Sequence, residues 1–96
     1  MNKEIILQQL KQFKDTSKNK YPIGNIGLFG SYARGENTNV SDIDIIVDFN
    51  NSIGWEYFNL TDELKRMFLH HKVDVVSKNA IPAMYWEFIK NDVLYV

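Results

Sequence analysis

Two apolar stretches flanking a glycine–serine turn constrain this chain more than any other feature. The first runs into Gly30 and Ser31, and the second, Asp42–Val47, follows a short polar loop. In the second stretch branched apolar residues alternate with Asp42 and Asp44, and the period of two puts both carboxylates on one face of a strand. The pattern predicts a strand with one buried face and one face that carries acid.

The rest of the chain alternates between helical and extended periodicity. We predict helices over Lys3–Thr16, briefly from Ser31, over Trp55–Phe68 and over Pro82–Ile89, and strands over Asn25–Phe29, Asp42–Val47, Lys72–Val76 and Val93–Val96. Strands separated by helical segments indicate an α/β (α+β) fold, in which a small mixed central sheet has helices packed on it. Residues 1–96 are expected to form a single domain.

Composition excludes several classes of protein. The net charge is −1 and no basic stripe is present, so nucleic acid is not expected as a partner. The chain has no cysteine, which excludes disulfides and thiolate metal sites. No apolar run is long enough for a membrane span or a signal peptide, and we expect a cytoplasmic protein.

The acidic strand is a candidate metal site. Residues i and i+2 of a strand lie about 6.5–7 Å apart on the same face, where two carboxylates repel each other. A bound Mg²⁺ would offset this repulsion, because it takes carboxylate oxygens at about 2.1 Å and keeps positions for water and phosphate. The alternative, for an isolated Asp-x-Asp, is an exposed strand face whose charges lie in solvent.

A third carboxylate, Asp74, lies in the otherwise apolar stretch Lys72–Val76. If that strand neighbours Asp42–Val47, Asp74 can face the same site and bind a metal or accept a proton from an attacking hydroxyl. The alternative is an ordinary charge on an edge strand. Asp48 is also in phase with Asp44, but we interpret it as a turn residue.

The glycine–serine turn can hold phosphate. Gly30 allows a sharp turn and a close backbone approach, and Ser31 adds a hydroxyl donor at the start of a short helix. Arg34, on the same turn, could contact phosphate or pair with Glu36. The turn is neither a Walker A loop nor a dinucleotide-binding fingerprint.

In combination these features resemble a known family. Gly30–Gly35, then Ser41-Asp42-Ile43-Asp44, then a later strand with Asp74, is similar to the nucleotidyltransferase superfamily that includes DNA polymerase beta. More narrowly, it resembles the minimal nucleotidyltransferase (MNT) proteins, over almost the whole chain. The resemblance implies a polymerase beta-like fold.

The resemblance also implies site residues, cofactors and partners. Gly30 and Ser31, with Arg34 and Ser41, would bind the nucleotide. Asp42, Asp44 and Asp74 would be the catalytic and metal-binding residues, with one or two Mg²⁺ ions and ATP as substrate. Some family members are antitoxins that transfer AMP to a tyrosine of a HEPN-type toxin protein.

The expected activity is therefore Mg²⁺-dependent transfer of AMP, or another NMP, to a hydroxyl of a partner protein. Two alternatives stay open. One is a small-molecule acceptor, as in the antibiotic-modifying nucleotidyltransferases, although this short chain leaves little room for acceptor-binding helices. The other is a non-catalytic antitoxin that acts by binding alone. Trp55 and Trp86 are candidates for an interface with a partner or a second copy.

Overall fold

Four strands form the centre of the structure, a computed structural model that describes residues 1–96. Their order across the sheet is β3 (Val73–Ser77), β2 (Ile43–Phe49), β1 (Ile23–Phe29) and β4 (Leu94–Tyr95). β1 is antiparallel to both of its neighbours, whereas β2 and β3 are parallel. The sheet is mixed because the connection between β2 and β3 passes through a helix, which returns the chain to the end of the sheet where β2 begins.

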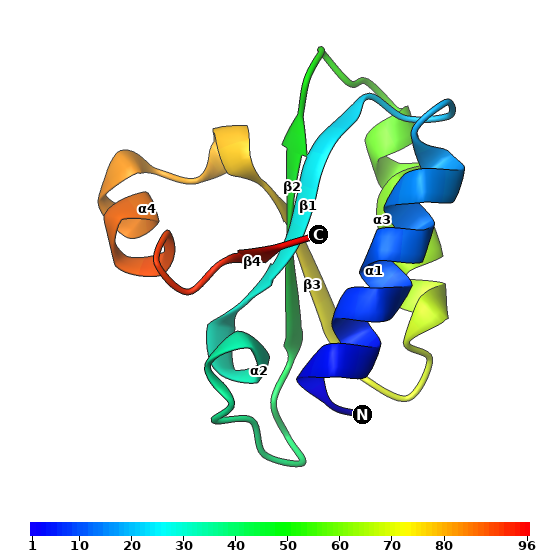
Figure 1. Ribbon diagram of the computed structural model, residues 1–96. Helices are drawn as coiled ribbons and strands as arrows, with labels where there is room; N and C mark the ends of the chain where they lie inside the picture. The colour runs from blue at the N-terminus through cyan, green and yellow to red at the C-terminus, as the bar shows by residue number, and fades with distance from the viewer.

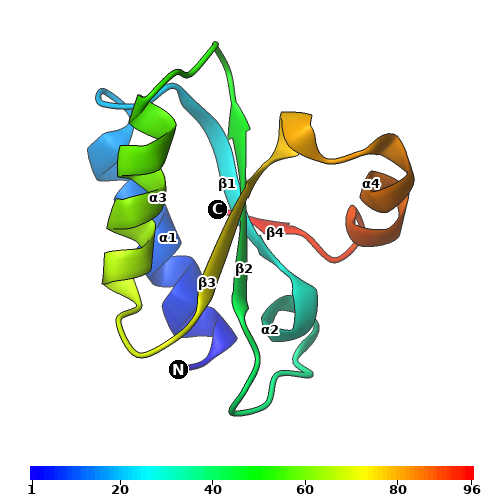
Figure 2. The ribbon, with the colours of Figure 1, turned by 180° about the vertical axis from the view of Figure 1, so that it is seen from behind.

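The helices lie on both sides of this sheet (Figure 1). α1 (Lys3–Ser17) and α3 (Glu56–Met67) pack side by side on one face. The short α2 (Gly30–Arg34) and α4 (Ala83–Ile89) lie on the other side, as the reverse view in Figure 2 also shows. A single 3-10 turn, η1 (Lys78–Ala80), leads from β3 to α4.

The hydrophobic core lies between the sheet and the α1/α3 layer. Helical spacing along α1 and α3 directs apolar side chains toward the sheet. Every second residue of β2 directs its side chain toward these helices. The fully buried members of this arrangement are Ile6, Leu10, Leu60, Leu64, Ile43, Ile45 and Val47. By contrast, α4 has no buried residue at all.

The predicted fold class and order of elements are confirmed, with differences at the ends of elements. β2 begins at Ile43 rather than Asp42 and extends to Phe49, so the prediction that Asp48 is a turn residue is wrong. Asp48 pairs with Asn25 inside the sheet, on the same face as Asp44. The 3-10 turn was not predicted. None of the helices combines the length and apolar character needed to cross a membrane.

Candidate active site

The glycine turn and the acidic strand meet at one end of the sheet. Phe29, the last residue of β1, pairs with Asp44 of β2, so Gly30 begins α2 directly beside that carboxylate. A Cβ at position 30 would collide with Asp44 Oδ2 and lie 3.1 Å from Asp44 Cγ. Gly30 also has φ +76°, in the left-handed region that favours glycine. Glycine is therefore required here both by backbone conformation and by the closeness of the carboxylate.

The third carboxylate lies on the neighbouring strand, level with the second. Asp44 and Asp74 are register partners on the parallel strands β2 and β3, so their side chains project from the same face of the sheet. Asp44 is half-buried and Asp74 is exposed. The sequence could place Asp74 beside Asp44 only if their two strands were neighbours, and β2 and β3 are neighbours in the sheet.

Asp42 lies just before β2. Its carboxylate is 3.7 Å from the ammonium of Lys72, the residue that precedes β3. It is close enough to Asp44 for its negative charge to influence the ionisation of that residue. Asp42 therefore reaches the site from the loop end rather than from the strand itself.

Asp44 is the most perturbed acid in the chain. Burial, followed by the negative charges of Asp74 and Asp42, raises the pKa of Asp44 from 3.8 to about 6, while the positive charge of Arg34 acts in the opposite direction. A carboxyl group with a raised pKa and two acidic neighbours is typical of a site that binds a cation or transfers a proton.

Two other predicted nucleotide-binding residues, Ser31 and Ser41, are next to Gly30 and Asp42 in the chain. Ser31 lies in the first turn of α2, which buries Tyr32 and Ala33 against the rest of the protein. Ser41 precedes Asp42, and its hydroxyl oxygen accepts a hydrogen bond from the Thr38 N–H at 2.8 Å, which closes the loop before β2.

Arg34 is held by two acids. Its guanidinium lies 3.3 Å from Glu36 Oε1 and 3.5 Å from Asp92 Oδ2. The hydrogen bond with Glu36 is the main cause that raises the pKa of Arg34. The sequence suggested the pair with Glu36, but Asp92 was missed, because it is remote in the chain and no spacing rule connects it to Arg34.

The donor set fits a hard divalent cation. Asp42 and Asp44 supply carboxylate oxygens, and the absence of a Cβ at Gly30 lets the Asp44 carboxylate lie against the backbone of the turn. No group of three or more histidine, aspartate or glutamate side chains is placed to hold a metal ion, and the predicted set of Asp42, Asp44 and Asp74 is no exception. Two carboxylates with the remaining positions left to water and phosphate is the mode of binding that suits Mg²⁺.

The two predicted interface tryptophans differ. Trp55, before α3, is 83% exposed and its ring lies 5.6 Å from that of Phe58, centroid to centroid. Trp86 is half-buried, with the Lys78 ammonium 5.0 Å from its ring centroid. α4 exposes three further large apolar side chains, those of Met84, Tyr85 and Phe88.

Comparison with known proteins identifies relatives in sequence and in fold. A Methanocaldococcus jannaschii protein named for protein adenylyltransferase activity, MJ1379, is 43% identical over 95 residues, which cover 95% of this chain and 94% of the relative. A solved structure described as a minimal nucleotidyltransferase superposes with a TM-score of 0.76 at 24% identity, over 98% of this chain and 95% of that one.

A second solved structure has the same fold at 19% identity, with a TM-score of 0.67 over 97% of this chain and 70% of the other. It is described as a tri-AMPylated Shewanella oneidensis HEPN toxin in complex with an MNT antitoxin. The model of the family "Polymerase beta, Nucleotidyltransferase" matches residues 11–96. The match spans most of the chain, including the turn and all three acids, and the chain is therefore a nucleotidyltransferase of the polymerase beta family.

Proposed function

We propose that this nucleotidyltransferase moves AMP from ATP, with Mg²⁺, to a hydroxyl group of a partner protein of the HEPN toxin class, and that it acts as the antitoxin of the pair. One observation carries the proposal: Asp44 and Asp74 lie level on neighbouring strands, and the Asp44 carboxylate lies directly against the glycine turn. The name of the M. jannaschii relative and the AMPylated toxin complex support the choice of AMP and of a protein acceptor.

The proposed residues divide the reaction among them. Gly30 and Ser31 would bind the β- and γ-phosphates through backbone N–H groups and the serine hydroxyl. Asp42 and Asp44 would hold Mg²⁺. When bound, the ion would neutralise charge that develops on the phosphate oxygens as the bonds change. Arg34 is positioned near Asp44 by Glu36 and Asp92 and would add a positive charge on the same side.

Asp74 is the proposed general base. The acceptor oxygen forms a bond to the α-phosphorus, the bond between that phosphorus and the bridging oxygen breaks, and pyrophosphate leaves with the bonding electrons. The proton of the acceptor hydroxyl passes to the Asp74 carboxylate, which is exposed and therefore accessible to a group on another chain.

A protein acceptor is also consistent with the open face of the molecule. α4 buries none of its residues and exposes large apolar side chains on the same side of the sheet as the carboxylates. Exposed apolar surface near a reaction site is typical of a region that a partner covers.

The test uses labelled ATP. Incubation of this protein with Mg²⁺, a HEPN-type partner and ATP labelled at the α-phosphate should transfer label to the partner, and label at the γ-phosphate should not be transferred. Transfer should be lost in Asp42→Asn and in Asp44→Asn and retained in Asp48→Asn, which changes an acid on the same face of the same strand. Absence of α-label transfer that depends on Asp42 and Asp44 would refute the proposal.

A further inference from the structure

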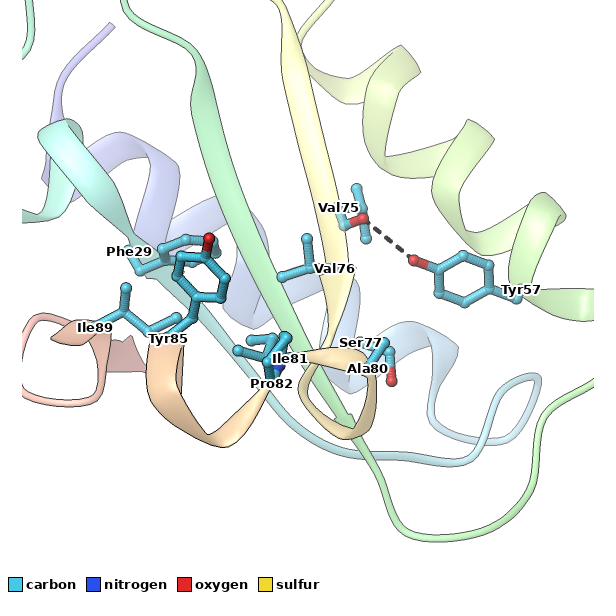
Figure 3. Close-up of a pocket in the computed structure, with 10 residues that line it drawn as sticks. All are labelled: Phe29, Tyr57, Val75, Val76, Ser77, Ala80, Ile81, Pro82, Tyr85 and Ile89. Atoms are coloured by element: carbon cyan, nitrogen blue, oxygen red, sulfur yellow. Dashed lines mark hydrogen bonds between the residues drawn. The ribbon is translucent and has the colours of Figure 1, made fainter. Parts of the chain in front are cut away.

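An apolar cleft of about 420 Å³ lies between the sheet and α4 (Figure 3). Eight of the ten residues that line it are hydrophobic. Its walls include Phe29 of β1, Val76 of β3 and Tyr85 and Ile89 of α4. We call it the α4 cleft. Its volume falls within the range of about 300–1,000 Å³ that is usual for small-molecule sites.

Most of the α4 cleft lies on the carboxylate face of the sheet, whereas Val75 and Tyr57 line it from the α3 side of β3. Phe29 is the register partner of Asp44, and Val76 lies two residues beyond Asp74 on β3, so both side chains project on the carboxylate side. The cleft therefore begins level with Asp44, at Phe29, and continues along the strands beneath α4.

The direction of the reaction indicates what the cleft holds, given the proposed function. Phosphates at Gly30 lie toward β1, and the acceptor at Asp74 lies on β3. Because attacking and leaving oxygens are in line through the phosphorus, the reaction axis crosses the strands. The nucleoside must leave the α-phosphate at an angle to this axis, either along the strands or away from the sheet, and a direction along the strands keeps it in contact with this chain. In one direction along them the polar loop 36–42 leads into β2, and in the other lies the α4 cleft.

We propose that the α4 cleft binds the nucleobase of the triphosphate, with the ring of Tyr85 in contact with the base. Tyr85 is 62% exposed, so its ring is available to cover a flat ligand. Aromatic rings hold bases by stacking, which every base can offer.

The lining also predicts weak discrimination between bases. Three side chains of the cleft, those of Tyr57, Ser77 and Tyr85, carry a polar atom, and the Tyr57 hydroxyl already donates a hydrogen bond to the Val75 carbonyl. Strong rejection of an analogue requires buried polar groups that would be left without partners. The Kd values for ATP and GTP analogues are therefore expected to lie within about tenfold of each other.

The test compares a ligand that has a base with one that has none. Calorimetry with Mg²⁺ would measure Kd for AMP-PNP and for inorganic tripolyphosphate in the wild type, Tyr85→Ala and Phe88→Ala. Phe88 is the matched control, since it is an exposed aromatic residue of the same helix that does not line the cleft. Tyr85→Ala should weaken AMP-PNP by about fivefold or more, the lower end of one stacked ring. It should leave tripolyphosphate unchanged, and Phe88→Ala should change neither Kd.

Two results would overturn the inference in different ways. If Tyr85→Ala leaves the Kd of AMP-PNP unchanged, the base lies elsewhere, whatever the variant does to labelling of the acceptor. If the wild type binds neither AMP-PNP nor tripolyphosphate, the proposed function fails and the assignment of the cleft fails with it.

Discussion

The two faces of the sheet are built from the same strands and differ in almost every other respect. On the α1/α3 face, Ile43, Ile45 and Val47 of β2 are fully buried under two helices. On the opposite face, the same strand presents Asp44 and Asp48 on either side of the fully buried Ile46, and α4 lies over an open cleft. Stability is concentrated on one face, which leaves the other free to carry charges that a closed core could not accommodate.

The largest expected effect is a loss of catalysis on the carboxylate face with no loss of stability on the α1/α3 face. Asp42→Asn and Asp44→Asn should each lower the rate of AMP transfer by about 100-fold to 1,000-fold or more, because each removes a charge expected to act on the transition state. Melting temperatures should not fall. Asp48→Asn should keep near wild-type rates in the same assay. A wild-type rate of AMP transfer in Asp44→Asn would contradict the claim that the carboxylate face carries out the reaction.

The closed face should respond in the opposite way. Leu64→Ala removes a fully buried side chain of α3 and should lower the free energy of unfolding by about 2–5 kcal/mol in urea titrations. Phe88→Ala, on α4, removes a side chain that is 76% exposed and should change it by less than about 0.5 kcal/mol. Equal losses for the two variants would contradict the division between the faces.

Two glycines at the ends of α2 allow the effect of backbone conformation to be separated from the effect of the nearby carboxylate. Gly30 and Gly35 have nearly the same conformation, φ +76° and +73°, but a Cβ at Gly35 would meet nothing within 4 Å. Gly35→Ala should therefore cost about 1–2 kcal/mol of stability through backbone conformation alone. Gly30→Ala should cost more and should also weaken binding of AMP-PNP, because Asp44 must move. Identical stability and affinity in both variants would rule out a tight approach at Gly30.

The smallest effect concerns pH. Because the folded pKa of Asp44 lies above its ordinary value, this residue favours the folded state while it is protonated, and that contribution is lost as the pH rises from about 4 to about 6. Without Mg²⁺, Asp44→Asn should therefore be more stable than the wild type at pH 7.5, by about 1 kcal/mol after solvent screening. At pH 4 the difference should nearly vanish. A constant difference across this range of pH would show that Asp44 ionises normally.

Much of this arrangement could be predicted from the sequence, because periodicity along β2 separates the two faces and helical spacing identifies α1 and α3. The neighbouring positions of Asp44 and Asp74 could not be derived in the same way, since strand order is a long-range property. Asp42 was expected within the strand, but pairing starts one residue later, at Ile43. The α4 cleft had no sequence signal, because its walls come from β1, β3 and α4.

The central claim is that nucleotide and metal meet on the carboxylate face, and paramagnetic NMR tests it most directly. Mn²⁺ added with AMP-PNP should first broaden the amide signals of Gly30, Ser31, Asp42, Asp44 and Asp74. In the Asp42→Asn and Asp44→Asn variants, the signals at the same positions should broaden much less. Signals along the outer side of α1 and α3 should stay sharp. Broadening centred on those helices, or broadening at the turn that is unchanged when both carboxylates are replaced, would contradict the account.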